Sequence, residues 1–166
     1  MLKVQFNQMT TPGYYESLPK KRMGSGAFLF DADGRFLIVK PTYKDGWEIP
    51  GGVVETNESP RRAVEREVEE EIGLKKMITK LLCVDYQDPL GEKTESLMFI
   101  FDGGILSVDE IGSIKLDSKE ISEFRFVTED EALNLLIPVL ARRVQQALSA
   151  RVQDKGVYLE NRELIP

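Results

Sequence analysis

The sequence predicts an α/β fold in which a mixed β-sheet lies between helices. Three observations lead to this class: apolar runs of strand length come first, an amphipathic helix follows, and further strands precede two terminal helices. The 166 residues suffice for one domain with a full-sized core. Since no repeat or low-complexity segment divides the chain, we expect one domain over residues 1–166, with an N-terminal arm (1–21) and a C-terminal helix and tail (138–166).

The first predicted elements are the arm and a hairpin. Residues 1–21 contain prolines and a glycine, which favour an irregular arm or a short edge strand. The apolar runs 27–30 and 35–39 predict two strands, and residues 31–34 have the composition of the turn that joins them. Residues 47–50 form a short extended piece, and the glycine pair after them begins a loop.

Residues 60–72 predict the first long helix. Ser59 is a favourable N-cap, Pro60 suits the first helical position, and Gly73 favours an end there. The stripe expected to face the core has apolar residues at i, i+4 and i+8, namely Val64, Val68 and Ile72. We therefore expect this helix to pack against the sheet.

The second half of the chain predicts strands followed by helices. The expected strands span residues 77–86, 96–101 and 121–127, with a loop at 87–94. The expected helices span residues 129–136 and about 138–150, and the tail 156–166 favours a short strand. Arg142 and Arg143 are assigned to the solvent side of the last helix.

The helix at residues 60–72 carries more negative charge than folding requires. Its glutamates are Glu65, Glu67, Glu69, Glu70 and Glu71. At about 100° per residue, Glu67, Glu70 and Glu71 fall within roughly a 100° arc beside the apolar stripe. Like charges at i,i+3 and i,i+4 repel by about 0.2–0.5 kcal/mol per pair. The arc therefore predicts a bound divalent cation.

The amino-acid composition limits the ligands and the catalytic groups that this protein can use. The net charge of −6 and a pI near 4.9 argue against tight, nonspecific nucleic-acid binding. The absence of histidine excludes Ser-His-Asp and Cys-His catalysis and His-ligated zinc. The metal chemistry that remains uses oxygen ligands, which suit Mg²⁺ or Mn²⁺.

Two further expectations concern the cysteine and the location of the protein in the cell. The single cysteine, Cys83, excludes an intramolecular disulfide, and its apolar surroundings in the sequence predict a buried thiol. No apolar run approaches the roughly 20 residues of a membrane span, and the N-terminus lacks the apolar core of a signal peptide. We therefore expect a cytoplasmic protein that does not bind membranes.

Residues 52–74 match the pattern G-x5-E-x7-R-E-U-x-E-E-x-G-U, in which U is a bulky aliphatic residue. The matching positions are Gly52, Glu58, Arg66, Glu67, Val68, Glu70, Glu71, Gly73 and Leu74. This segment resembles the Nudix box of the Nudix hydrolases, and the resemblance extends from about Met23 to Leu136. It implies an α/β/α sandwich in which the box forms a loop–helix–loop.

The resemblance also implies an activity. Nudix hydrolases cleave a diphosphate bond in a nucleoside diphosphate linked to another moiety X, with Mg²⁺ as cofactor; here an ADP-ribose-like compound and a nucleoside triphosphate both stay open. Pro89 resembles a proline associated with the ADP-ribose pyrophosphatases of the family. The expected partner is a small nucleotide. An RNA 5′ end is the one nucleic acid that stays open, as does a homodimer formed through the arm or the last helix.

Carried over to this sequence, the resemblance assigns the metal site. The residues that resemble the cation ligands are Glu67, Glu70, Glu71 and, through its carbonyl, Gly52. Arg66 resembles the residue that holds a catalytic glutamate in place, and Glu58 resembles its structural partner in the loop. The general base stays open between the box, at Glu67 or Glu71, and a later loop.

The later loop offers Glu120 and Glu123 as the base, and a solvated strand entrance is the plain alternative for both. The candidate substrate contacts are Lys40, Tyr43, Lys44, Trp47 and Tyr86. A lysine there can meet a phosphate, and an aromatic ring can stack on a base. The plain alternative is a solvated loop after a strand for Lys40, Tyr43 and Lys44, whereas core packing is the favoured interpretation of Tyr86.

Two rival functions can be weighed from the residues. A nucleotide-sensing or regulatory module on the same fold usually loses box glutamates, whereas this chain retains them. Isoprenoid diphosphate isomerisation on a related scaffold resembles chemistry that needs a reactive cysteine and histidine ligands, and this chain has no histidine. Hydrolysis is therefore the expected activity.

Overall fold

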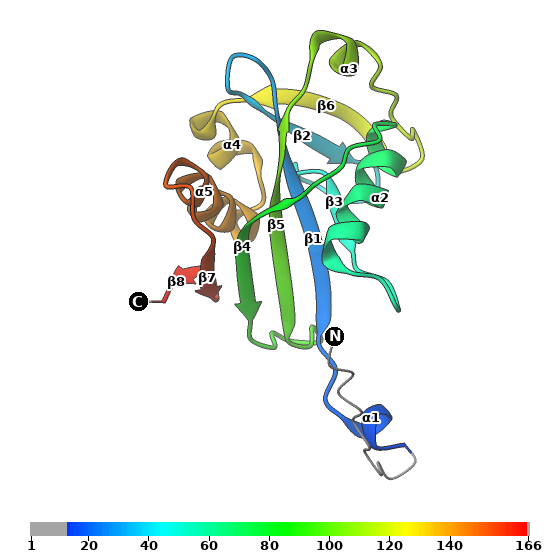
Figure 1. The fold of residues 1–166 in the computed structure, drawn as a ribbon, viewed down its shortest axis with the longest axis vertical. Coiled ribbons are helices and arrows are strands. Elements are labelled where there is room, and N and C mark those ends of the chain that lie inside the picture. The colour runs from blue at the N-terminus through cyan, green and yellow to red at the C-terminus, as the bar shows by residue number, and fades with distance from the viewer. Residues whose placement is uncertain (1–12, 166) are drawn as a thin grey trace, which may run out of the picture.

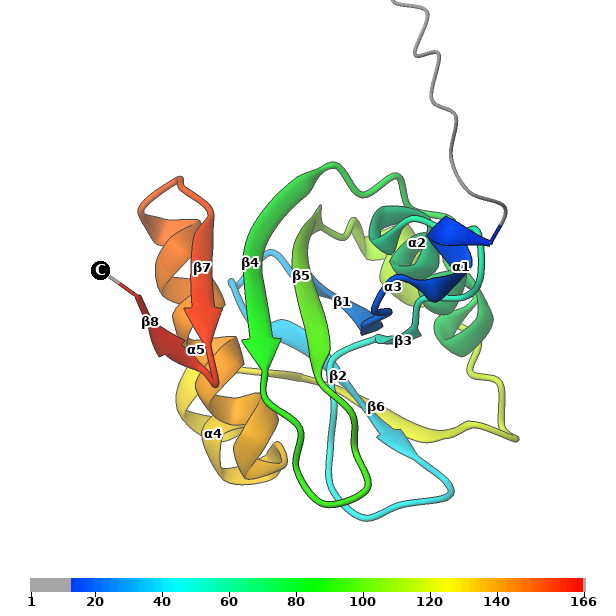
Figure 2. The same ribbon diagram turned by 90° about the horizontal axis from the view of Figure 1, so that it is seen from below.

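The computed structural model describes residues 13–165, which form a mixed β-sheet covered by helices on both faces (Figure 1). The strands are β1 (Arg22–Phe30), β2 (Phe36–Pro41), β3 (Gly51–Val53), β4 (Lys80–Gln87), β5 (Ser96–Ile105), β6 (Ile121–Val127), β7 (Val157–Glu160) and β8 (Glu163–Leu164). The helices are α1 (Tyr14–Ser17), α2 (Pro60–Ile72), α3 (Val108–Gly112), α4 (Glu129–Leu135) and α5 (Pro138–Val152). Figure 2 shows α2 on one side of the sheet and α4 and α5 on the other. The predicted α/β sandwich is confirmed.

The sheet is centred on the parallel pair β1 and β5. Its order is β6-β2-β1-β5-β4-β7-β8, and β3 pairs with β1 outside this path. The pairs β1–β2, β1–β3, β2–β6 and β4–β5 are antiparallel, whereas β4–β7 is parallel. The predicted hairpin is β1 and β2, with Phe30 opposite Phe36. Because β3 pairs with β1, the loop of the box begins beside the centre of the sheet.

Strand β1 is apolar on both faces because helices cover both. Phe28 and Phe30 belong to a core cluster with residues of α5, whereas Ala27 and Leu29 belong to a second cluster with residues of α2. Successive side chains of a strand point to opposite faces of its sheet. The uninterrupted apolar run at residues 27–30 is therefore the pattern of a strand buried on both sides.

Helix α2 has the bounds that its capping residues predict. The Ser59 hydroxyl accepts a hydrogen bond from the Arg62 N–H at 3.3 Å. Gly73 adopts a φ of 74°, and its N–H donates to the Glu69 carbonyl at 3.0 Å. The apolar stripe is fully buried at all three positions: Val64, Val68 and Ile72.

The glycine pair before the box forms strand β3, where the sequence predicts the start of a loop. Gly51 has a φ of 147°, and a Cβ there would lie 2.1 Å from the Ser25 carbonyl oxygen. No side chain fits such an approach of two backbones. This close pairing depends on contacts between segments far apart in the sequence, so the local pattern does not reveal it.

Other elements differ from the prediction mainly in length. Strand β5 continues to Ile105, α5 continues to Val152, and the tail forms β7 and β8 instead of one strand. Helix α3 is a capped turn that the sequence analysis missed, although Ser107 and Glu110 form the capping box that signals a helix start. Of the predicted arm, residues 13–21 are described and include the short helix α1, whereas residues 1–12 lie outside the described range.

The prediction that Arg142 and Arg143 both face solvent is wrong for Arg143. Arg142 is exposed, but Arg143 is only 5% exposed. Helix α5 buries Val144 and Ala147 against the sheet. Arg143 precedes Ala147 by four residues and therefore shares the buried face.

The remaining expectations concern the thiol and membranes. Cys83 is fully buried, as predicted, and burial is the main cause that raises the pKa of its thiol to about 12. Such a thiol is a core residue and not a nucleophile. Within residues 13–165, no helix has the length and apolar character needed to cross a membrane.

We expect Val68→Asp to unfold the protein or lower its free energy of unfolding by more than about 3 kcal/mol, because it places a charge at a fully buried position of α2. Chemical denaturation monitored by circular dichroism measures this change. Glu69→Gln, at an exposed position on the same helix, is the control and should stay within about 0.5 kcal/mol of the wild type. Equal stability of Val68→Asp and the wild type would contradict the orientation of α2.

Candidate active site

A cleft of about 620 Å³ runs from the acidic side of α2, across β1 and β3, to α5. The loop after β2 and the ends of β4 and β5 complete its wall. The residues that line its acidic end are Glu48, Gly51, Gly52, Val53, Glu55, Arg66, Glu67, Glu70, Glu71 and Glu120. Helix α2 thus presents its glutamate arc to a cavity, as the helical spacing predicts.

Glu71 is the most deeply buried carboxylate of the cleft, with 7% of the residue exposed. Its Oε2 accepts a hydrogen bond from the Gly51 N–H at 2.9 Å. Burial, with smaller contributions from the charges of Glu67, Glu48 and Glu120, raises its pKa to about 8. The causes of this shift include burial and three neighbouring glutamates but no cationic side chain, so the negative charge of an ionised Glu71 would have no cationic partner.

Arg66 joins the box helix to the box loop. Its Nη1 donates to Glu67 Oε1 at 2.9 Å and to Glu70 Oε2 at 2.8 Å. Its Nε and Nη2 donate to the two oxygens of Glu58 at 3.0 and 3.1 Å, and Nη2 also donates to the Val53 carbonyl at 3.1 Å. The hydrogen bonds with Glu58 are the main cause that raises the pKa of Arg66. One guanidinium therefore positions two of the expected cation ligands and the loop that faces them.

The acidic end of the cleft fits a hard divalent cation in donor type and in charge. Burial is the main cause that raises the pKa of Glu67, and the charges of Glu70 and Glu120 add to it. A Cβ on Gly52 would lie 2.3 Å from Glu67 Oε1, so glycine allows the backbone to lie against this carboxylate. Carboxylate and carbonyl oxygens are the ligands that Mg²⁺ and Mn²⁺ prefer.

The carboxylates of the cleft are not arranged as the complete ligand set of a metal ion. Within the described residues, no group of three or more His, Cys, Asp or Glu side chains is placed to hold an ion. Arg66 instead occupies oxygens of Glu67 and Glu70. A bound cation would take over part of the charge balance that Arg66 now provides.

The two later-loop glutamates lie in different places. Glu120 lines the cleft, and its charge contributes to the raised pKa of both Glu67 and Glu71. Glu123 is absent from the lining of the cleft and pairs with Arg125 at 2.7 Å. The structure thus brings Glu120, and not Glu123, to the box carboxylates.

Of the predicted substrate contacts, Tyr43 and Lys44 line the cleft. The Lys44 ammonium pairs with Glu48 at 2.8 Å, and its desolvation is outweighed by this partner, so its pKa is raised. Lys40 is exposed on β2 and is not among the cleft residues. The loop after β2 therefore contributes its tip, and not its base, to the cavity.

The structure places the other two candidates away from the cavity. Trp47 is 7% exposed in the core cluster of α5, with the Arg125 guanidinium 4.7 Å from its ring centroid. The Tyr86 hydroxyl donates to Glu95 at 2.8 Å. Neither residue is among those that line the cleft.

The far end of the cleft contains residues that the sequence analysis did not single out. They are Arg22, Gly24, Gly26, Ile49, Gln87, Lys93, Ser96, Met98, Leu140 and Arg143. One signal was available, since Arg143 falls on the apolar face of α5 by its spacing. The others come from β1, β4, β5, α5 and two loops, whose meeting depends on the strand order.

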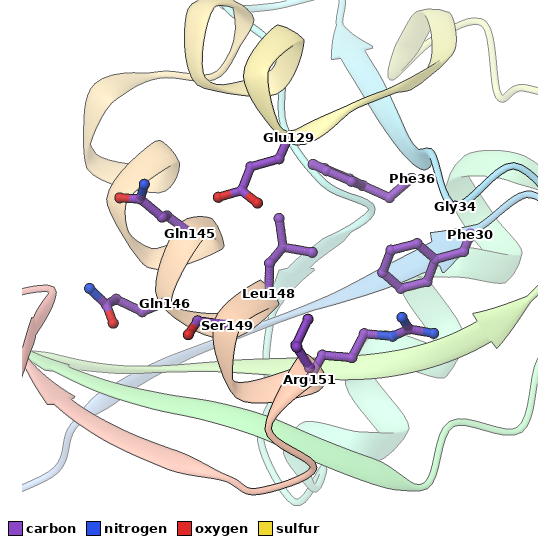
Figure 3. A pocket seen from close by; sticks show the side chains of 10 residues that line it. Phe30, Gly34, Phe36, Glu129, Gln145, Gln146, Leu148, Ser149 and Arg151 are labelled. Carbon is purple, nitrogen blue, oxygen red and sulfur yellow. The ribbon is translucent and has the colours of Figure 1, made fainter.

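A second depression, of about 580 Å³, lies between α5, the start of α4 and the β1–β2 turn (Figure 3). The Arg151 guanidinium lies 3.9 Å from the Phe30 ring centroid, and its Nε donates to Asp102 at 2.9 Å. Glu129 is the one acidic residue of its lining. This depression has a single carboxylate in its lining, whereas several line the cleft, so the cleft is the candidate active site.

Comparisons with known proteins agree with this geometry. A family model described as "NUDIX domain" matches residues 20–148 and so reaches further into α5 than the predicted resemblance. A MutT-like protein of Streptomyces ambofaciens is 28% identical over 140 residues, which cover 84% of this chain and 85% of that protein. An RNA pyrophosphohydrolase of Hydrogenovibrio crunogenus is 30% identical over 118 residues, which cover 62% of this chain and 69% of that protein.

The fold is also similar to that of solved structures. The crystal structure of a MutT protein from Methanosarcina mazei Go1 superposes with a TM-score of 0.65 and 23% identity. The superposition covers 84% of this chain and 99% of that protein. This likeness concerns the fold of the sheet and its helices.

We expect the melting temperature of the metal-free protein to fall as the pH rises from about 5 to about 9. The folded-state pKa of Glu71, about 8, exceeds its ordinary value of 4.5, so the folded protein keeps a proton that the unfolded chain releases. The resulting stability is complete below pH 4.5 and is lost as the pH rises through about 8. Scanning calorimetry in a chelator measures it. Glu71→Gln should flatten the profile, and parallel profiles of variant and wild type would contradict the assignment.

Proposed function

Because this chain belongs to the NUDIX domain family and is a hydrolase, we propose that it uses Mg²⁺, or Mn²⁺ in its place, to hydrolyse a nucleoside diphosphate linked to another moiety X. The bond cleaved is the diphosphate bond, in an ADP-ribose-like compound or a nucleoside triphosphate. The observation that carries the proposal is the cleft in which the box glutamates, Gly52 and Arg66 meet Glu120. A nucleotide is large enough to need the volume of such a cleft.

In this proposal, residues of α2 and β3 bind the metal ion. Glu67, Glu70, Glu71 and the carbonyl of Gly52 hold the ion. When bound, Mg²⁺ supplies neutralisation of the phosphoryl oxygens and activation of a water. Arg66 keeps Glu67 and Glu70 in place and holds the loop through Glu58, as its hydrogen bonds support.

Glu120 serves as the general base in this proposal. The chain has no histidine, and several carboxylates line the cleft, so we assign the proton of the attacking water to a carboxylate. Glu120 lines the cleft close enough to influence the box carboxylates, whereas Glu123 is paired with Arg125. Its position on another segment leaves the box glutamates free to act as ligands.

The loop after β2 meets the substrate through Tyr43 and Lys44. Both residues line the cleft, and Lys44 is paired with Glu48, so its ammonium can turn to a phosphate without leaving the cleft. Lys40, Trp47 and Tyr86 lie outside the lining, and we assign them supporting roles in the strands that frame the site.

A turnover screen in Mg²⁺ tests the activity. It should include normal and damaged dNTPs, ADP-ribose, nucleotide sugars, dinucleoside polyphosphates and capped or triphosphorylated RNA ends. We expect one class to be cleaved well above the rest. Tight, metal-dependent binding of nucleotides without turnover of any would instead indicate a sensing module.

Glu70→Gln should lower kcat/KM by at least about a hundredfold, because even residues that only orient metal ligands typically contribute ten- to a hundredfold. The substitution removes a charge with little change in volume. Glu69→Gln is the matched control, since Glu69 is exposed on the same helix and pairs with Lys75. Steady-state kinetics over a range of Mg²⁺ concentrations measure the effect, and near-wild-type activity of Glu70→Gln at low Mg²⁺ would refute the metal role.

Glu120→Gln should lower kcat by about 10²–10⁴-fold with little change in KM, which is the usual contribution of a general base. Glu123→Gln, three residues further along the chain, should remain within a few-fold of the wild type. The pH dependence of kcat should lose its acidic limb in Glu120→Gln alone. A large loss of kcat in Glu123→Gln, with near-wild-type kcat in Glu120→Gln, would instead identify Glu123 as the general base. Wild-type kcat in both variants would assign the general base to Glu67 or Glu71 of the box.

A further inference from the structure

Arg143 of α5 and Asp85 of β4 form an ion pair buried at the far end of the cleft. The Arg143 Nε donates to Asp85 Oδ2 at 2.8 Å, and the two residues are 5% and 0% exposed. Apolar residues of similar volume often stabilise a protein as well as such a pair does. Packing of α5 on the sheet therefore does not by itself account for these charges.

The two partners differ in how many of their hydrogen-bonding groups are used. Both oxygens of Asp85 are used: Oδ1 accepts from the Arg162 N–H at 2.9 Å, and Oδ2 accepts from Gln87 Nε2 at 3.1 Å as well as from Arg143. A guanidinium has five N–H donors, and that of Arg143 uses its Nε donor in this pair. Among the described residues, no fully buried side-chain nitrogen or oxygen lacks a partner, so the Nη groups of Arg143 keep some exposure. Arg143 lines the cleft, and we infer that these donors face it.

Part of the wall at this end of the cleft is apolar. A Cβ on Gly24 would lie 2.5 Å from Met98 Cε, and a Cβ on Gly26 would lie 2.8 Å from Ile49 Cδ1. The missing side chains of β1 therefore let Met98 and Ile49 lie directly against its backbone, and both line the cleft. A flat apolar wall beside a planar guanidinium suits a planar ring with polar edges.

The charge at this end favours a neutral acceptor over a further anion. Asp85 already balances Arg143, so a buried phosphate would be left without a counter-charge. Arg22 and Lys93 also line the cleft, but both are exposed, and Arg22 donates to Thr94. Their charges are therefore solvated.

We propose that Arg143, oriented by Asp85, determines base specificity by donating two parallel hydrogen bonds to the adjacent acceptors of a 6-oxopurine, the O6 and N7 of guanine. Adenine presents an N6 amino donor beside N7, which the guanidinium cannot satisfy. The inference rests on the proposed function: it names guanine as the base of the nucleoside diphosphate that the cleft takes. ADP-ribose itself would then be a poorer substrate than its guanine counterpart.

The first test needs no variant. Calorimetric Kd values for GMP and AMP, and kcat/KM for GDP- and ADP-linked forms of the same sugar, should favour guanine by about ten- to a hundredfold, the usual contribution of a bidentate arginine contact. Equal affinity for GMP and AMP, or tighter binding of AMP, would overturn the proposal. If no diphosphate compound is cleaved, the proposed hydrolysis fails, whereas the comparison of GMP with AMP still decides the role of Arg143.

Arg143→Lys tests the residue itself. Lysine keeps the charge opposite Asp85 but lacks the planar fork, so the preference for guanine should fall to within about threefold, mainly through KM and with kcat for each compound little changed. Arg142→Lys is the matched control, since Arg142 is exposed on the adjacent position and pairs with Glu163. An unchanged preference in Arg143→Lys, with a wild-type melting temperature, would make the ion pair purely structural and refute the proposal.

A double variant tests whether the base preference can be reversed from guanine to adenine. Asp85→Asn with Arg143→Gln removes both buried charges together, and a glutamine can pair with the N6 donor and N7 acceptor of adenine. The ratio of the GMP and AMP Kd values should therefore invert in a protein that still melts cooperatively. A loss of inorganic phosphate binding, with the base ratio unchanged, would assign Arg143 to a phosphate instead and overturn the proposal.

Discussion

The candidate site depends on how the protein accommodates several carboxylates, some of them buried, in one cleft. Glu67 and Glu71 are partly or deeply buried, and burial raises the pKa of each. Arg66 offsets part of this cost by donating to Glu67, Glu70 and Glu58 at the same time. The helix and the loop of the box are therefore one electrostatic unit, and the negative charge that Arg66 leaves unbalanced supports the proposed binding of a cation.

The backbone of the sheet sets how close the parts of this unit lie. Gly51 and Gly52 allow β3 to lie against β1 and against the Glu67 carboxylate, where any side chain would collide. The Gly51 N–H then donates to Glu71, the most deeply buried carboxylate of the box helix. Strand β1 is buried on both faces at residues 27–30, so this arrangement is anchored in the two core clusters. A rigid frame of this kind keeps catalytic groups within the small tolerances that their chemistry requires.

In the proposed function, one end of the cleft carries out hydrolysis and the other end binds the base of the substrate. Its acidic end is built from α2, β3 and the loop that carries Glu120, and it supplies the charge pattern of diphosphate hydrolysis. Its far end is built from β1, β4, β5 and α5, and it contains apolar walls with the Arg143–Asp85 pair. In the proposed function, the metal ligands thus come from a contiguous motif, whereas the general base and the selection of the substrate depend on elements that the fold brings together.

This division explains what the sequence alone determined. The ends of α2, its buried stripe and its glutamate arc follow from capping and from the helical period, which act within a few residues. The family follows from the same local pattern. The tertiary structure decided which residues of different segments meet: that Glu120 and not Glu123 reaches the cleft, that Trp47 lies in the core, and that Arg143 is buried against Asp85. Such contacts depend on strand order and register, which neither propensity nor spacing encodes.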